Sequence, residues 1–125
     1  MKILLFSLFL LLFVSCSDVI TKHYDNYQTA KKDGLFLKGW LPDFIPTSSK
    51  NIVTNNNLDL NTSDGEFYFD MKEFSEFTSF LKDEKKTQNG FIIYSYTNNL
   101  SSWKFLITPK SGFVKYSLTK INNNR

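Results

Sequence analysis

Residues 65–81 read Gly-Glu-Phe-Tyr-Phe-Asp-Met-Lys-Glu-Phe-Ser-Glu-Phe-Thr-Ser-Phe-Leu. The spacing of the apolar side chains changes within this stretch, from the two-residue period of a strand to the period of a helix. In residues 65–70 apolar and polar side chains alternate, with Phe67 and Phe69 on the same side, which is typical of a half-buried strand. Asp70 then offers a cap for a helix, and the next apolar side chains recur at helical spacing. These are Phe74, Phe77, Phe80 and Leu81. The stretch predicts a strand followed by an aromatic-rich helix with a buried apolar stripe.

The chain after this helix favours strands. The polar residues 82–90 predict a loop, and three strand-like runs follow it. The runs are residues 91–97, 102–108 and 112–118, separated by the turn-forming residues 98–99 and 109–112. Together with the strand at 65–70, they predict an α+β fold: a small antiparallel sheet of about four strands with the aromatic-rich helix packed on it.

The chain before residue 65 is less regular. Residues 24–33 predict a short N-terminal helix that Gly34 ends. Residues 35–46 contain two prolines among apolar side chains, so we interpret them as a rigid, partly buried elbow. A short helical turn is expected after residue 47, and residues 55–57, three asparagines, then favour a turn.

The N-terminus has the pattern of an export signal. Lys2 precedes an apolar run at residues 3–14 that only Ser7 interrupts. As a helix this run is about 18 Å long, against a hydrocarbon core of about 30 Å, so a processed signal is favoured over a membrane-spanning helix. Cys16, the only cysteine, follows directly and has no partner for an internal disulfide.

Phe13-Val14-Ser15-Cys16 resembles the lipobox of bacterial lipoproteins, although Phe13 stands where leucine is usual. The resemblance implies that Cys16 carries a diacylglycerol and becomes the first residue after cleavage, so the lipid bilayer is the expected partner through acylated Cys16. An ordinary signal peptide with an incidental cysteine is the alternative. If the cell has two membranes, Ser17 in place of aspartate implies the periplasmic face of the outer membrane.

This interpretation divides the chain into four parts: a lipoprotein signal peptide at 1–15, the lipidated Cys16 and a tether at 16–23, a single globular α+β domain at 24–121 and a frayed tail at 122–125. Residues 16–125 carry 14 basic and 12 acidic side chains, and their net charge of +2 is too balanced for a nucleic-acid partner, which export would exclude in any case. The 13 phenylalanines, 6 tyrosines and 2 tryptophans provide the large buried areas that a small domain without disulfides needs.

Residues between 27 and 69 resemble a family of small bacterial envelope lipoproteins to which no activity is assigned. The resemblance is carried by Gly39-Trp40-Leu41-Pro42, Ile45-Pro46, Ser48-Ser49, Leu58-Asp59, Asn61 and Gly65-x-Phe67-x-Phe69. The chain departs from the family pattern at Ser49, Asn57 and Leu60. The resemblance implies an envelope location and one folded unit.

The candidate binding surface combines two groups of residues. Trp40, with Phe36 and Phe44, can form an exposed aromatic platform for a glycan or an envelope protein, although a tryptophan held between glycine and proline is more often buried in the core. Asp59 and Asn61 add a polar cluster. We assign no cofactor.

No catalytic constellation is visible. His23 is the only histidine and lies near the tether, so neither a nucleophile–histidine pair nor a zinc site can be assembled. Residues 59–70 follow a calcium loop only superficially, because the required glycine is one place late and no helix precedes them. Asp59 and Glu66 are a carboxylate pair that could hydrolyse a glycan. The sequence therefore predicts an envelope lipoprotein with a non-catalytic binding or structural role. One alternative is a small carboxylate-dependent glycan hydrolase. Another is a ligand carrier, which needs a larger cavity than we expect this fold to enclose.

Overall fold

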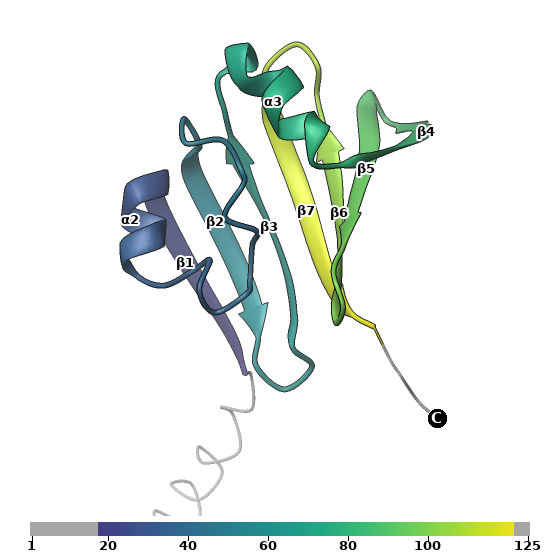
Figure 1. Ribbon diagram of the computed structural model, residues 1–125. Helices are drawn as coiled ribbons and strands as arrows, with labels where there is room; N and C mark the ends of the chain where they lie inside the picture. The colour runs from purple at the N-terminus through teal and green to yellow at the C-terminus, as the bar shows by residue number, and fades with distance from the viewer. Residues whose placement is uncertain (1–17, 122–125) are drawn as a thin grey trace, which may run out of the picture.

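A single antiparallel sheet of seven strands organises the protein (Figure 1). The computed structural model describes residues 18–121. The strands are β1 (Val19–Asn26), β2 (Lys50–Asn57), β3 (Thr62–Tyr68), β4 (Lys82–Gln88), β5 (Phe91–Thr97), β6 (Ser101–Ile107) and β7 (Phe113–Lys120). Their order in the sheet is β1-β2-β3-β7-β6-β5-β4, and every neighbouring pair is antiparallel.

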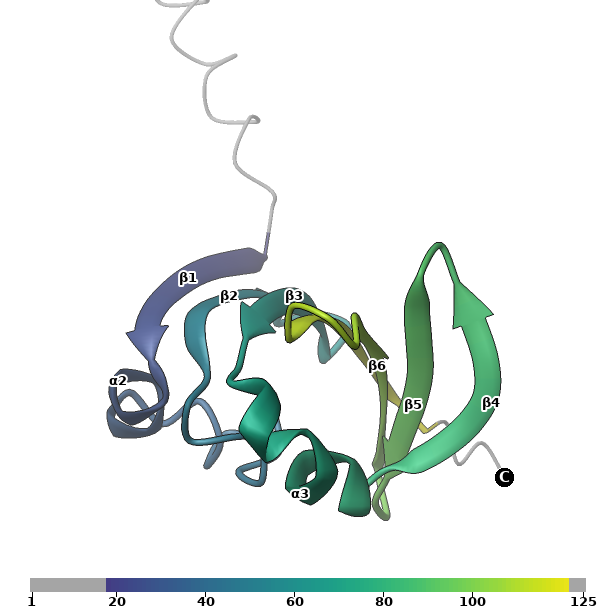
Figure 2. The same ribbon diagram turned by 90° about the horizontal axis from the view of Figure 1, so that it is seen from above.

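Two meanders build this sheet. The first runs through β1, β2 and β3, and the second runs through β4, β5, β6 and β7. They join where β7 returns beside β3, with Ser63 opposite Leu118 and Tyr68 opposite Phe113. Seen from above, the strands follow an arc, and α3 (Phe74–Ser79) lies on its inner side between the ends of β3 and β4 (Figure 2). The curved sheet therefore has a concave face that encloses the core.

The helices are short, and side chains cap two of the helical segments. Helix α2 (Tyr27–Lys32) follows β1 directly, and Asn26 Oδ1 accepts a hydrogen bond from the Thr29 amide at 2.9 Å. Asp70 caps the 3₁₀ turn η2 (Met71–Glu73), which leads into α3, through the Lys72 amide. These caps satisfy helix-start amides that would otherwise lack partners.

The core lies between the concave face and the segments that cover it. Inward-facing side chains alternate along the strands, including Ile52, Phe67, Phe105, Ile107, Val114 and Leu118. Phe77 is 1% exposed, and its ring lies 5.5 Å from those of Phe69 and Phe105 between centroids. Both contacts are edge-on, the arrangement that aromatic rings favour.

The elbow at residues 35–46 covers the rest of the concave face. It contains turns and no strand, and Leu35, Leu41 and Ile45 within it are 1–2% exposed. Trp103 Nε1 donates a hydrogen bond to the Trp40 carbonyl at 3.1 Å, which ties the elbow to β6. The predicted elbow is present as a partly buried segment, and its prolines lie among buried apolar side chains.

The prediction of a four-stranded sheet with one packed aromatic helix is wrong. The sheet has seven strands, and the helical part of residues 71–79 is split into η2 and the six-residue α3. Residues 82–88, expected to be a loop, form β4, and residues 55–57, expected to form a turn, lie in β2. The long apolar stripe does not form either, since Phe80 is 50% exposed.

The N-terminal segment differs as well. The predicted tether at residues 16–23 and the predicted start of a helix at residue 24 do not agree with the structure, because residues 19–26 form β1 and pair with β2. The lipobox, Cys16 and the tail at 122–125 lie outside the described residues. Within residues 18–121, no helix is long and apolar enough to cross a bilayer.

Candidate functional site

A groove beside Trp40 lies on the concave side. Its volume is about 380 Å³, and its walls come from β1, β2 and the elbow. The apolar lining residues are Ile20, Leu35, Trp40 and Leu58. Trp40 is half-buried, so its ring contributes both to the core and to the groove. Such a surface offers apolar and aromatic contact to a ligand.

One wall of the groove holds a charged network. Asp33 Oδ2 accepts hydrogen bonds from Lys22 Nζ at 2.9 Å and from the Tyr24 hydroxyl at 2.7 Å. These two donors, Tyr24 first, hold the pKa of the Asp33 carboxyl below its ordinary value. Burial and the Asp33 charge raise the pKa of Tyr24. Both donors bind the same carboxylate oxygen, so Asp33 fixes the positions of Lys22 and Tyr24 in the groove wall.

A buried polar cluster lies on the same concave face and reaches the groove through Asn56. The Ser63 hydroxyl donates to Asn56 Oδ1 at 2.7 Å and shares a second hydrogen bond with the Tyr116 hydroxyl at 2.9 Å. Thr54 Oγ1 is also buried and has no partner among the described residues. Burial raises the pKa of Tyr116 strongly, and the Asp64 charge adds to this effect.

Alkaline conditions are expected to destabilise the fold through Tyr116. The folded protein keeps this hydroxyl protonated above its ordinary pKa of 10.0, where the unfolded chain releases the proton. The contribution of protonated Tyr116 to stability is therefore fully present below about pH 10. Above that pH the free energy of unfolding falls, by up to about 1.4 kcal/mol per pH unit for one group. Urea unfolding at about pH 8 and about pH 11 measures this fall.

Tyr116→Phe is expected to reduce the loss of unfolding free energy at alkaline pH. Tyr68→Phe, which changes a more exposed tyrosine, should leave that loss unchanged. An equal fall in the wild type and in Tyr116→Phe would contradict the assignment.

The structure does not bring the three predicted aromatic residues into one platform. Trp40 lines the groove, but Phe36 stacks on Tyr27 with a centroid distance of 4.7 Å. Phe44 stacks on Phe80 at 4.7 Å and meets Tyr96 edge-on at 4.8 Å. All three predicted residues are half-buried.

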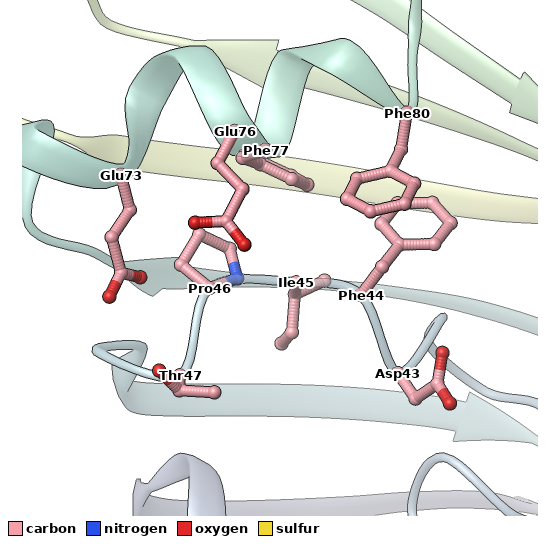
Figure 3. Close-up of a pocket in the computed structure, with 9 residues that line it drawn as sticks. All are labelled: Asp43, Phe44, Ile45, Pro46, Thr47, Glu73, Glu76, Phe77 and Phe80. Atoms are coloured by element: carbon pink, nitrogen blue, oxygen red, sulfur yellow. The ribbon is translucent and has the colours of Figure 1, made fainter.

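Phe44 instead borders a second, smaller cavity of about 200 Å³ between the elbow and α3 (Figure 3). Two carboxylates, Glu73 and Glu76, reach this cavity from the helical segment. Glu73 Oε2 accepts a hydrogen bond from the Ser48 hydroxyl at 3.0 Å, and Ser48 Oγ in turn accepts one from the Asp70 amide at 2.9 Å. Glu73 thus ties the residues between the elbow and β2 to the start of the helical segment, which is a structural role.

Asp59 and Asn61 lie in the turn between β2 and β3. Asn57 Oδ1 accepts hydrogen bonds from the amides of Asp59 and Leu60, both at 3.1 Å, and Asn61 has a positive φ of 52°. A hydrogen bond with Asp18, together with the charge of Asp18, raises the pKa of the Asp59 carboxyl. Both residues shape a hairpin, and their neighbour Leu58 enters the groove.

The carboxylates of the hydrolase alternative occupy different surfaces. Glu66 lies within β3, on the face opposite the buried Phe67, and its register partners are Val53 and Lys115. Asp59 lies in the hairpin beyond the start of that strand. Within residues 18–121, no group of three metal-ligating side chains lies together. The side chains around the groove can bind and orient a molecule.

Sequence reasoning missed Lys22, Tyr24 and Asp33 as a set. Lys22 and Tyr24 are two apart on one strand, but β1 had been divided between a tether and a helix. Only the alternation of Ile20, Lys22 and Tyr24 could have placed these side chains on one face.

Residues 18–68 match the model of a protein family described as the YbbD head domain. The matched region begins at Asp18 and ends at Tyr68, so it contains β1, α2, the elbow, β2 and β3 with all residues that line the groove. The second meander lies outside it. No curated protein and no solved structure matches the chain.

Proposed function

We propose that the protein is a lipid-anchored protein of the bacterial cell envelope with a non-catalytic binding or structural role. Residues 1–15 act as its signal peptide, and Cys16 carries the acyl chains. The observation that carries the proposal is the distance along the chain between the lipobox and the sheet. Strand β1 begins at Val19, three residues after Cys16, so the folded domain is held directly at the bilayer surface.

The short connection agrees with the extent of the family match. That match begins at Asp18, two residues after Cys16. Several acyl chains on one cysteine give a stable attachment, where one chain alone is reversible. The periplasmic face of the outer membrane is the proposed location in a cell with two membranes.

The groove beside Trp40 is the proposed binding surface for an envelope protein or a glycan. Its apolar walls and the Trp40 side chain supply contact area, while Lys22 and Lys38 in its lining supply hydrogen-bond donors. The catalytic alternative receives no support from the positions of Asp59 and Glu66, which lie on different elements.

Acylation of Cys16 is the first test of this proposal. Cells grown with an alkyne-bearing fatty acid are expected to label the wild-type protein and not Cys16→Ala, because the thiol is the acceptor of the lipid. Ser17→Ala is the matched control and should be labelled like the wild type. Equal labelling of wild type and Cys16→Ala would contradict the anchor.

A further inference from the structure

One end of the sheet gathers most of the exposed large apolar side chains. Nine such side chains occur among the described residues, and six of them lie at this end. They are Val19, Ile20, Leu58, Leu60, Leu100 and Ile121, with exposed fractions from 38% to 66%. Figure 1 shows the segments that carry them at its lower side: the start of β1, the β2–β3 hairpin, the β5–β6 turn and the end of β7. We call this set the apolar rim.

The apolar rim is fastened to the point where the chain leaves the proposed anchor. The Leu58 amide donates a hydrogen bond to the Asp18 carbonyl at 3.0 Å, and Val19 is in register with Asn57. Across the sheet, the Ile121 amide donates to the Leu100 carbonyl at 2.9 Å. Val19 follows Cys16 by three residues in the sequence, and three residues of extended chain span at most about 10 Å.

From this position we infer that the apolar rim rests on the lipid bilayer, with Val19, Ile20, Leu58 and Leu60 in contact with the lipids. This inference rests on the proposed function, since the anchor places the bilayer at this end of the sheet. Monomeric proteins rarely expose large apolar side chains in groups without a partner. Once the domain is anchored, contact of the rim with the bilayer is an intramolecular step, so a small apolar area is sufficient.

Charges at the rim are compatible with this contact. The two carboxylates nearest the anchor are Asp18 and Asp59, and the closeness of Asp18 raises the pKa of the Asp59 carboxyl above its ordinary value. Lys120 Nζ donates to Ser101 Oγ at 3.0 Å at the far side of the rim, where a cation can face lipid phosphates. The groove beside Trp40 shares Ile20 and Leu58 with the rim, so bilayer contact places the groove next to the membrane surface.

Site-specific fluorescence tests the contact in the full chain. Because acylation consumes the only native thiol, Leu60→Cys provides a single site for an environment-sensitive nitrobenzoxadiazole label. Leu60 is 66% exposed at the hairpin, so the substitution leaves the core intact. Lys110→Cys is the matched control, exposed in the β6–β7 turn at the opposite end of the sheet. Both labelled proteins are reconstituted into phosphatidylcholine–phosphatidylglycerol vesicles with and without doxyl-labelled lipid.

The inference predicts a blue-shifted emission and severalfold stronger quenching by doxyl lipid at position 60 than at position 110. Equal quenching at the two positions, in protein that floats with the vesicles, would overturn the bilayer contact and leave the anchor standing. Failure of the wild-type protein to float with the vesicles would overturn both the anchor and the contact.

Discussion

Phe77→Ala is expected to lower the free energy of unfolding by about 3–5 kcal/mol, the usual cost of removing a buried phenylalanine ring. The ring is 1% exposed and contacts aromatic side chains from β3, from β6 and from the elbow. Its removal leaves a cavity that these rigid elements cannot close. Urea unfolding followed by tryptophan fluorescence measures the change.

Phe80→Ala is the matched control on the same helical segment. Phe80 is 50% exposed, and its main aromatic partner is Phe44, so the loss is expected to be about 1 kcal/mol. Equal losses for the two variants would show that Phe77 is not the centre of the core.

Gly65→Ala is expected to cost about 3 kcal/mol or more, because the strand position has no space for a side chain. A Cβ atom at Gly65 would lie 1.9 Å from the Val53 carbonyl oxygen and 2.9 Å from Tyr116 Cε1. The carbonyl belongs to the neighbouring strand near an irregularity in the β2–β3 register. To relieve the clash, β2 and β3 would have to separate.

Gly90→Ala provides the comparison for Gly65→Ala. Gly90 has a positive φ of 84°, but a Cβ atom there would meet nothing within 4 Å. Its substitution therefore costs only the backbone strain, about 1–2 kcal/mol. Denaturant midpoints and soluble yield compare the two variants, and a Gly65→Ala protein as stable as Gly90→Ala would contradict the close approach of β2 and β3.

The three C-terminal strands could be predicted from the sequence because apolar and polar side chains alternate along two of them. Residues 91–97 form β5 as predicted, and β6 and β7 differ from their predicted ranges by one or two residues. In β6 the buried residues are Ser101, Trp103, Phe105 and Ile107. In β6 and β7 one face is buried, so their apolar side chains recur at every second residue, whereas β5 buries the adjacent residues Ile93 and Tyr94 and was recognised from its apolar and aromatic composition.

The two edge strands could not be found in that way. Strand β4 reads Lys-Asp-Glu-Lys-Lys-Thr-Gln, with no apolar residue, and β1 carries one buried side chain, Tyr24. An edge strand has only one pairing neighbour, and charged side chains on it discourage pairing with other molecules. Composition therefore resembled a loop and a tether. Asn89-Gly90 was the neglected signal, since both residues have positive φ in the tight turn between β4 and β5.

The candidate site was predicted only in part. Trp40 was singled out and does line the groove, but its partners come from β1 and from the hairpin after β2. Ile20 and Leu58 lie on opposite sides of the elbow in the sequence. Only the pairing of β1 with β2 brings them together beside Trp40. Phe36 and Phe44 share the elbow with Trp40, yet their side chains pack against other aromatic rings. Proximity in sequence did not determine which side chains share a surface.

The intact mass of the protein extracted from membranes of its host tests the central claim most directly. The anchored protein is expected to have the mass of residues 16–125 plus a diacylglycerol and any amide-linked acyl chain, with the added mass on the N-terminal cysteine. A chain of unmodified mass, whether it begins at Met1 or at another residue with Cys16 as a free thiol, would contradict the account.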